Sequence, residues 1–146
     1  MLLKEIIPNI WISNKLEFSN GISNLFGLNN YVNCDFDLRN LNKSKNYNFE
    51  IKKRIFKYEV LKISEYLFET TKYIHKNIKC NKSTIIYSTD INKSIMLILA
   101  YLILYGKIDL SCAIQIVKTK IDNEFNLNDK YKMSLETFEK QYKFFS

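Results

Sequence analysis

The chain has 146 residues, of which 47% are hydrophobic and 25% are charged, so its composition is that of an ordinary globular protein and excludes a disordered or fibrous one. Lysine and arginine number 22 against 15 aspartates and glutamates, which gives a net charge of +7. One proline and three glycines leave no stretch with the composition of a flexible linker, and we expect a single domain over residues 1–146.

The positive charge raises the question of a nucleic-acid or anionic-membrane partner. Arg39 and Arg54 are the only arginines, and the lysines are spread along the whole chain. High contents of lysine, asparagine, isoleucine and tyrosine are also what an AT-rich genome produces without any pressure on function. A solvated basic surface is therefore the favoured interpretation, and a nucleic-acid partner is not expected.

The sequence contains no segment typical of a secretory signal or a membrane span. The opening apolar stretch is too short and includes Glu5, and the longest apolar run, residues 95–105, has about 11 residues where a span needs about 20. The three cysteines lack the spacing of metal ligands. We expect an intracellular, cytoplasmic protein with no membrane contact, no metal and no cofactor.

Strand and helix patterns alternate in the first part of the chain. The expected elements are strands over residues 8–13, 30–34 and 54–60, a short helix over residues 18–28 and a polar loop over residues 35–48. Pro8 suits the edge of the first strand, and Gly27 suits the end of the helix.

Helices dominate the second part of the chain. The expected elements are a helix over residues 63–78, a strand over 83–87, a polar loop over 88–93, and helices over 94–105, from 109 or 111 to 117, and over 129–145. Gly106 suits the end of the strongly apolar helix before it. The pattern predicts an α/β fold with a single central mixed or parallel sheet of about four to five strands flanked by helices.

A strand, a tight polar loop and a buried helix follow one another from Thr84 to Leu102. The N–H groups of such a loop and of the helix N-terminus point at one place, which is a ready anion site. Here the chain resembles the dual-specificity protein phosphatases, whose signature is a strand, then His-Cys-x-x-Gly-x-x-Arg-Ser, then a helix that ends Ala-Tyr-Leu. Residues 97–102, Leu-Ile-Leu-Ala-Tyr-Leu, match that helix, and the likeness is greatest to poxvirus members of the family.

Counted back from that helix without a gap, the family's catalytic loop falls on residues 87–94. The resemblance places Tyr87 on the family's cysteine, Asp90 on its glycine, Lys93 on its arginine and Ser94 on its serine. The other positions of this degenerate phosphate loop are Ser88, Thr89, Ile91 and Asn92, and Ile86 replaces the histidine.

The resemblance extends over nearly the whole chain. Residues 10–13 resemble the family's first strand, 31–34 its Val-Leu-Asn strand, 63–67 the helix before the active-site strand, and 113–118 and 135–139 its two C-terminal helices. It implies that the domain over residues 1–146 has a dual-specificity-phosphatase-like fold.

The family's reaction forms a phosphocysteine, which needs a thiolate of low pKa and an arginine that holds the phosphate. Tyr87 cannot replace the thiolate, Lys93 lacks the planar fork of arginine, and Asp90 brings negative charge into a site for a dianion. No cysteine is followed six positions later by an arginine; the residues there are Asn40, Ile86 and Lys118. The general acid is also missing, because the short segment 58–63 holds Glu59 rather than a matching aspartate. The sequence therefore predicts no catalytic residues and no enzyme activity.

We interpret the chain as a catalytically inactive homologue, a pseudophosphatase, that works by binding another protein. The resemblance implies a shielding or scaffolding role toward a phosphoprotein or a host protein, and the densest basic stretch offers Lys52, Lys53 and Arg54 as candidate docking residues. The poxvirus likeness and the AT-rich bias suggest a viral protein of the infected host cell or the virion, with an AT-rich protist as the alternative. Self-association as a homodimer is left open.

Two other functions stay open: a residual phosphatase with atypical chemistry that uses Tyr87 or a bound water, and a basic nucleic-acid-binding protein. Ser88 has no base within a motif, so a loop hydroxyl bonded to the backbone is favoured over a nucleophile. His75 is the only histidine and is expected to be a solvated surface residue.

Overall fold

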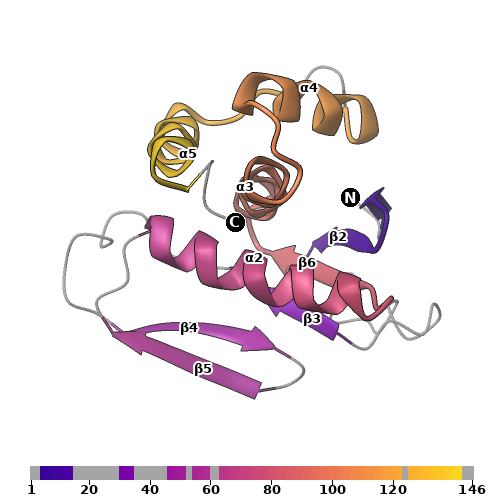
Figure 1. Cartoon of the computed structure of the whole chain (residues 1–146), viewed down its shortest axis with the longest axis vertical. Coiled ribbons are helices and arrows are strands. Elements are labelled where there is room, and N and C mark those ends of the chain that lie inside the picture. Colours follow the sequence, from indigo (N-terminus) through magenta and orange to yellow (C-terminus); the bar gives the residue numbers. More distant parts are fainter. Residues whose placement is uncertain are drawn as a thin grey trace.

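The computed structural model describes residues 4–14, 30–34, 46–51, 54–59, 63–122 and 125–142 (Figure 1). The strands in these ranges are β1 (Lys4–Ile7), β2 (Ile10–Asn14), β3 (Asn30–Asn33), β4 (Asn46–Ile51), β5 (Arg54–Glu59) and β6 (Thr84–Ser88). The helices are α2 (Ile63–Lys79), α3 (Ile91–Leu104), α4 (Leu110–Lys120) and α5 (Asp129–Tyr142). The helix expected over residues 18–28 lies outside the described residues.

The strands form one mixed sheet in the order β1-β2-β6-β3-β4-β5. β6 lies between β2 and β3 and runs parallel to both, whereas β1, β4 and β5 join at the edges in antiparallel pairs. All five residues of β6 are buried, as expected of a parallel strand in the middle of a sheet. This arrangement confirms the predicted α/β fold.

The described sheet has six strands rather than the four to five expected, and β1 is one of the two that the prediction missed. Pro8 and Asn9 form a turn between β1 and β2 rather than the edge of a strand. Asn9 has φ 71°, which suits the third position of a tight turn after proline, and its N–H donates to Glu5 Oε2 at 3.0 Å. A four-residue strand ending at that turn was too short to show a pattern.

β4 is the other missed strand, because residues 46–48 fall in the stretch that we expected to be a loop. Asparagine has low strand propensity, and β4 begins Asn-Tyr-Asn. Its pairing with β5 runs in register from Asn46 opposite Glu59 to Ile51 opposite Arg54. Cross-strand pairing therefore decides the structure against the local preference of the sequence.

α3 is the central helix of the domain. It contacts β2 and β6 on one side and α2, α4 and α5 on the others, so it lies between the sheet and the outer helices (Figure 1). Every residue from Ser94 to Leu104 is buried, and each fully buried leucine or isoleucine contributes about 1.5–3 kcal/mol of hydrophobic free energy. A helix that is apolar all round is one that other elements cover on every side.

The predicted stop at Gly106 is confirmed, since α3 ends at Leu104. A Cβ atom on Gly106 would lie 2.5 Å from the carbonyl oxygen of Leu102, so any other residue would force the backbone apart. None of the helices in the described ranges is both long and apolar enough to cross a lipid bilayer.

His75 on α2 is not the solvated surface residue that we expected. Its Nδ1 lies 3.1 Å from the hydroxyl of Tyr101, and its ring stacks on Tyr105 with centroids 3.9 Å apart. Burial, together with the charge of Lys79, lowers the pKa of His75 from 6.5. Tyr101 and Tyr105 make these contacts. They are too far from His75 along the chain to show in a local pattern, and this explains the difference.

A pH dependence of stability follows from this contact. Because the folded protein binds a proton at His75 less readily than the unfolded chain, the free energy of unfolding should fall as pH drops from 7 through the unfolded pKa of about 6.5. Urea unfolding at pH 7 and pH 5 should show this loss, and His75→Gln should reduce it because His75 is the only histidine. An equal loss in His75→Gln would contradict the assignment.

Candidate functional site

The candidate site is the connection between β6 and α3, at the carboxyl end of the parallel strands. Tyr87 is the fourth residue of β6 and is only 4% exposed. It lies opposite Ser13 of β2 and Asn33 of β3. The sheet thus places Tyr87, which we expect at the position of the family's cysteine, on the central strand, at the end that leads into α3.

The loop is shorter than expected, because α3 begins at Ile91 rather than at residue 94. Asp90 is the N-cap of the helix: its Oδ1 accepts hydrogen bonds from Asn92 N at 3.0 Å and from Asn92 Nδ2 at 3.2 Å. The Lys93 N–H also donates, at 2.9 Å, to the Asp90 carbonyl. Aspartate is among the strongest N-cap residues, so Asp90 starts the helix where the family signature has glycine.

The second oxygen of Asp90 is held by α5. The Tyr131 hydroxyl donates to Asp90 Oδ2 at 2.9 Å, so the C-terminal helix is tied to the loop. Burial alone would raise the pKa of Asp90, but the hydrogen bonds from Asn92 and Tyr131 and the charge of Lys93 lower it below 3.8. Burial, the hydrogen bond to Asp90 and the Asp90 charge raise the pKa of Tyr131 to about 12.

In this geometry a carboxylate of the protein itself occupies the anion site at the start of α3. The Asp90 carboxylate takes the N–H of Asn92 in the first turn of α3, the place where the N-terminus of a helix attracts an anion. A phosphate brought to about 4 Å from Asp90 would meet a repulsion of about 4 kcal/mol per unit charge at an effective dielectric constant of about 20. The loop therefore carries its own anion and disfavours a second one.

The two serines of the loop belong to a hydrogen-bond chain. Ser88 Oγ donates to the Asp90 carbonyl at 2.6 Å and lies 2.7 Å from Ser94 Oγ. Because the single hydroxyl proton of Ser88 is used on that carbonyl, Ser94 is the donor in the second bond. The prediction that Ser88 bonds to the backbone is confirmed.

Cys34 is the residue at this site that sequence reasoning missed. Its N–H donates to the Tyr87 carbonyl at 3.0 Å, and its Sγ lies 3.4 Å from Ser94 Oγ, although the side chain is fully buried. The family's spacing of six residues from cysteine to arginine applies within one continuous segment. It therefore could not reveal that Cys34 reaches this loop from another strand. A partial signal was present, since Cys34 ends a predicted strand; β3 runs parallel to β6, and the carboxyl ends of parallel strands meet.

The remaining predicted site residues lie in three places. Thr89 is exposed in the loop, whereas Ile91, Asn92 and Lys93 are half-buried in the first turn of α3. Arg54 is the first residue of β5, and Lys52 and Lys53 lie outside the described residues. Within the described ranges, His, Cys, Asp and Glu form no group of three or more that could hold a metal ion.

Comparison with known proteins identifies the family. Residues 10–141 match the catalytic domain of the dual specificity phosphatases, so the chain belongs to this family. No curated protein sequence shows significant similarity to the chain.

Solved structures of the same fold are similar over almost the whole chain. A variant of human DUSP28 has 14% sequence identity and a TM-score of 0.70, with 97% of this chain and 96% of that chain covered. A leucine rich repeat and phosphatase domain containing protein from Entamoeba histolytica has 16% identity and a TM-score of 0.68, with 95% and 91% covered. A human tyrosine phosphatase-like serine/threonine/tyrosine-interacting protein has 16% identity and a TM-score of 0.66, with 95% and 96% covered. At such identities the likeness establishes the fold.

Proposed function

We propose that this member of the dual specificity phosphatase family is catalytically inactive and acts by binding another protein. The observation that carries the proposal is the position of the Asp90 carboxylate, which bonds to the N-terminus of α3 and to Tyr131. An enzyme that holds a phosphoryl group at this place needs free N–H groups and positive charge. In this chain the Asn92 N–H is already bonded to the Asp90 carboxylate.

The chemistry of the loop supports the same proposal. Tyr87 offers a phenol, which is a weak nucleophile, where the family uses a thiolate. Lys93 supplies charge without the bidentate geometry of arginine. Among the structural neighbours, one is itself named a phosphatase-like interacting protein, which fits a binding role on this fold.

The direct test is hydrolysis of an aryl phosphate and of phosphopeptides by the purified chain. We expect no turnover above buffer, because the thiolate, the arginine and the general acid of the family have no counterparts here. Tyr87→Phe is the control, since it removes only the phenolic oxygen from a buried ring. Turnover that disappears in Tyr87→Phe would refute the proposal, whereas turnover that persists unchanged would have to be traced to another residue or to a contaminant.

A cysteine-dependent hydrolase is the second candidate function, favoured by the position of Cys34. The thiol lies 3.4 Å from Ser94 Oγ, directly beside the loop. Its complete burial argues against the role, because a nucleophile must reach its substrate. Cys34→Ser decides between the two candidates, since activity of this kind would disappear in that variant.

The basic stretch before β5 remains our prediction for partner capture. Charge reversal at Lys52, Lys53 and Arg54 should weaken capture of a host-cell partner, because it reverses the charge offered to an acidic surface, while the thermal midpoint should stay nearly unchanged. Tyr87→Phe should leave capture intact. Loss of capture in Tyr87→Phe but not in the charge-reversed protein would make the degenerate loop the binding site. The viral origin of the protein and a host-cell location remain hypotheses.

A further inference from the structure

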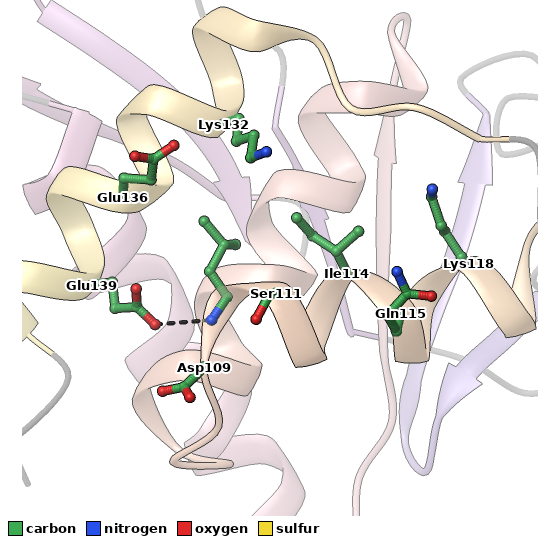
Figure 2. Close-up of a pocket in the computed structure, with 9 residues that line it drawn as sticks. Asp109, Ser111, Ile114, Gln115, Lys118, Lys132, Glu136 and Glu139 are labelled. Carbon is green, nitrogen blue, oxygen red and sulfur yellow. Dashed lines mark hydrogen bonds between the residues drawn. The ribbon is translucent and has the colours of Figure 1, made fainter.

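A groove lies between α4 and α5, on the far side of α3 from the sheet (Figures 1 and 2). Its volume is about 540 Å³, within the range of 300–1,000 Å³ that is usual for ligand sites. Leu110 and Ile114 supply apolar surface, and Ser111 and Gln115 supply hydrogen-bonding groups from α4. The remaining lining side chains are charged.

The two walls of the groove are fixed to one another. Glu139 of α5 accepts a hydrogen bond from the backbone N–H of Leu110, the first residue of α4, at 2.8 Å (Figure 2). Asp109, the N-cap residue of α4, makes no capping bond with its own side chain. The Glu139 carboxylate of the neighbouring helix therefore caps α4. The groove is already formed without a ligand, which lowers the entropy lost on binding.

The charges in the groove are of both signs. Asp109, Glu136 and Glu139 are acidic, Lys132 lies next to Glu136 on α5, and Lys118 lies apart from them along α4 (Figure 2). Within the described part of the chain, Glu136, Lys118 and Lys132 take part in no ion pair. Three carboxylates on a protein of net charge +7 are a poor place for nucleic-acid phosphate.

An exposed apolar side chain borders the same helix face. Met133 of α5 is 67% exposed and precedes Glu136 by one helical turn, so the two lie on neighbouring positions of the surface. Exposed methionine is frequent where a protein binds peptides, because its flexible side chain adapts to the partner. The lining of the groove itself combines charge of both signs with the apolar surface of Leu110 and Ile114.

We propose that this groove binds a short peptide segment of a partner protein, one that carries a basic side chain close to an acidic one. The basic side chain lies against Asp109, Glu136 and Glu139, the acidic side chain lies against Lys118, and an apolar residue between them contacts Ile114. The inference rests on the proposed function, protein binding, and adds to the basic stretch before β5 a second surface with its own partner chemistry.

The test uses the full chain and a synthetic peptide with one arginine and one aspartate on either side of a leucine. Backbone amide shifts in NMR spectra should move at Ser111, Gln115 and Glu136 on titration. Glu136→Lys and Lys118→Glu should each weaken binding about fivefold or more, because each turns an attraction into a repulsion. Glu65→Lys, the same change on an exposed residue of α2, should leave the affinity unchanged.

Any one of the following results would overturn the inference. An all-arginine or all-aspartate peptide that binds as well, or an equal loss in Glu65→Lys, would show unspecific attraction. Shifts at the groove produced by duplex DNA and not by the peptide would assign the groove to nucleic acid. If millimolar peptide moved no amide shifts, the groove would not have this role. The proposed function would still be supported by the absence of turnover and by the capture of a partner, which are measured separately.

Discussion

Tyr87→Cys alone is expected to give no phosphatase turnover, even though it restores the family's nucleophile at its position in β6. The new thiol would lie beside a loop whose carboxylate, Asp90, already takes the Asn92 N–H. Without the arginine and with this negative charge nearby, its pKa should stay at or above the free value of about 8.5. Steady-state hydrolysis of an aryl phosphate and a titration of thiolate absorbance measure both quantities.

Recovery should require Asp90→Gly and Lys93→Arg in addition. Glycine at position 90 removes the cap that starts α3 at Ile91, and arginine at position 93 supplies the planar fork. The Asp90→Gly/Lys93→Arg double variant with Tyr87 retained is the control, because it has the altered loop without a thiol there. A burst of product from the single variant Tyr87→Cys would show that the loop chemistry matters less than we infer.

Asp90→Ala should lower the free energy of unfolding by about 2–3 kcal/mol, from the lost N-cap and from the buried Tyr131 hydroxyl left without its acceptor. Asp109→Ala is the matched control, because Asp109 is also an N-cap residue but its side chain makes no capping bond. That change should cost less than about 0.5 kcal/mol. Urea unfolding of the two variants gives the comparison, and equal losses would rule out a special role for the Asp90 carboxylate.

Asp90 and Tyr131 should each make stability depend on pH, Asp90 at acid pH and Tyr131 at alkaline pH. Because the folded protein lowers the pKa of Asp90, its contribution is present above the ordinary value of 3.8 and is lost as pH falls through the folded pKa. Because the pKa of Tyr131 rises from 10.0 to about 12, its contribution is lost as pH rises between those values. Tyr131→Phe should remove the alkaline limb, and in a double-mutant cycle with Asp90→Ala the two losses should not add.

The parts of the fold that could be predicted are those with long, regular patterns. α2 carries apolar residues at helical spacing, and α3 is a continuous apolar run whose end Gly106 marks, so both could be found without other information. The edges of the sheet could not be predicted, because β1 has four residues and β4 begins with residues that favour loops. Those strands exist through pairing with partners elsewhere in the chain.

The strand-loop-helix segment that carries the candidate site was predicted from the sequence, but its geometry was not. The substitutions at Tyr87, Asp90 and Lys93 are visible in the sequence, and the strand and helix around them were predicted. The role of Asp90 as a cap bonded to Tyr131 could not be predicted, because the two residues are 41 positions apart. Cys34 was missed for the same physical reason, since only the pairing of β3 with β6 brings it to Ser94.

The Asp90 carboxylate competes with phosphate for the N-terminus of α3, and it cannot dissociate because it is part of the chain. It is covalently attached and held by Asn92 and Tyr131, so its effective concentration at the N-terminus of α3 is set by the fold and does not fall when phosphate is diluted. A free phosphate compound at cellular concentrations would have to displace this ligand before it could bind. The conformation of the loop should therefore be the same in a phosphate-rich and a phosphate-poor solution.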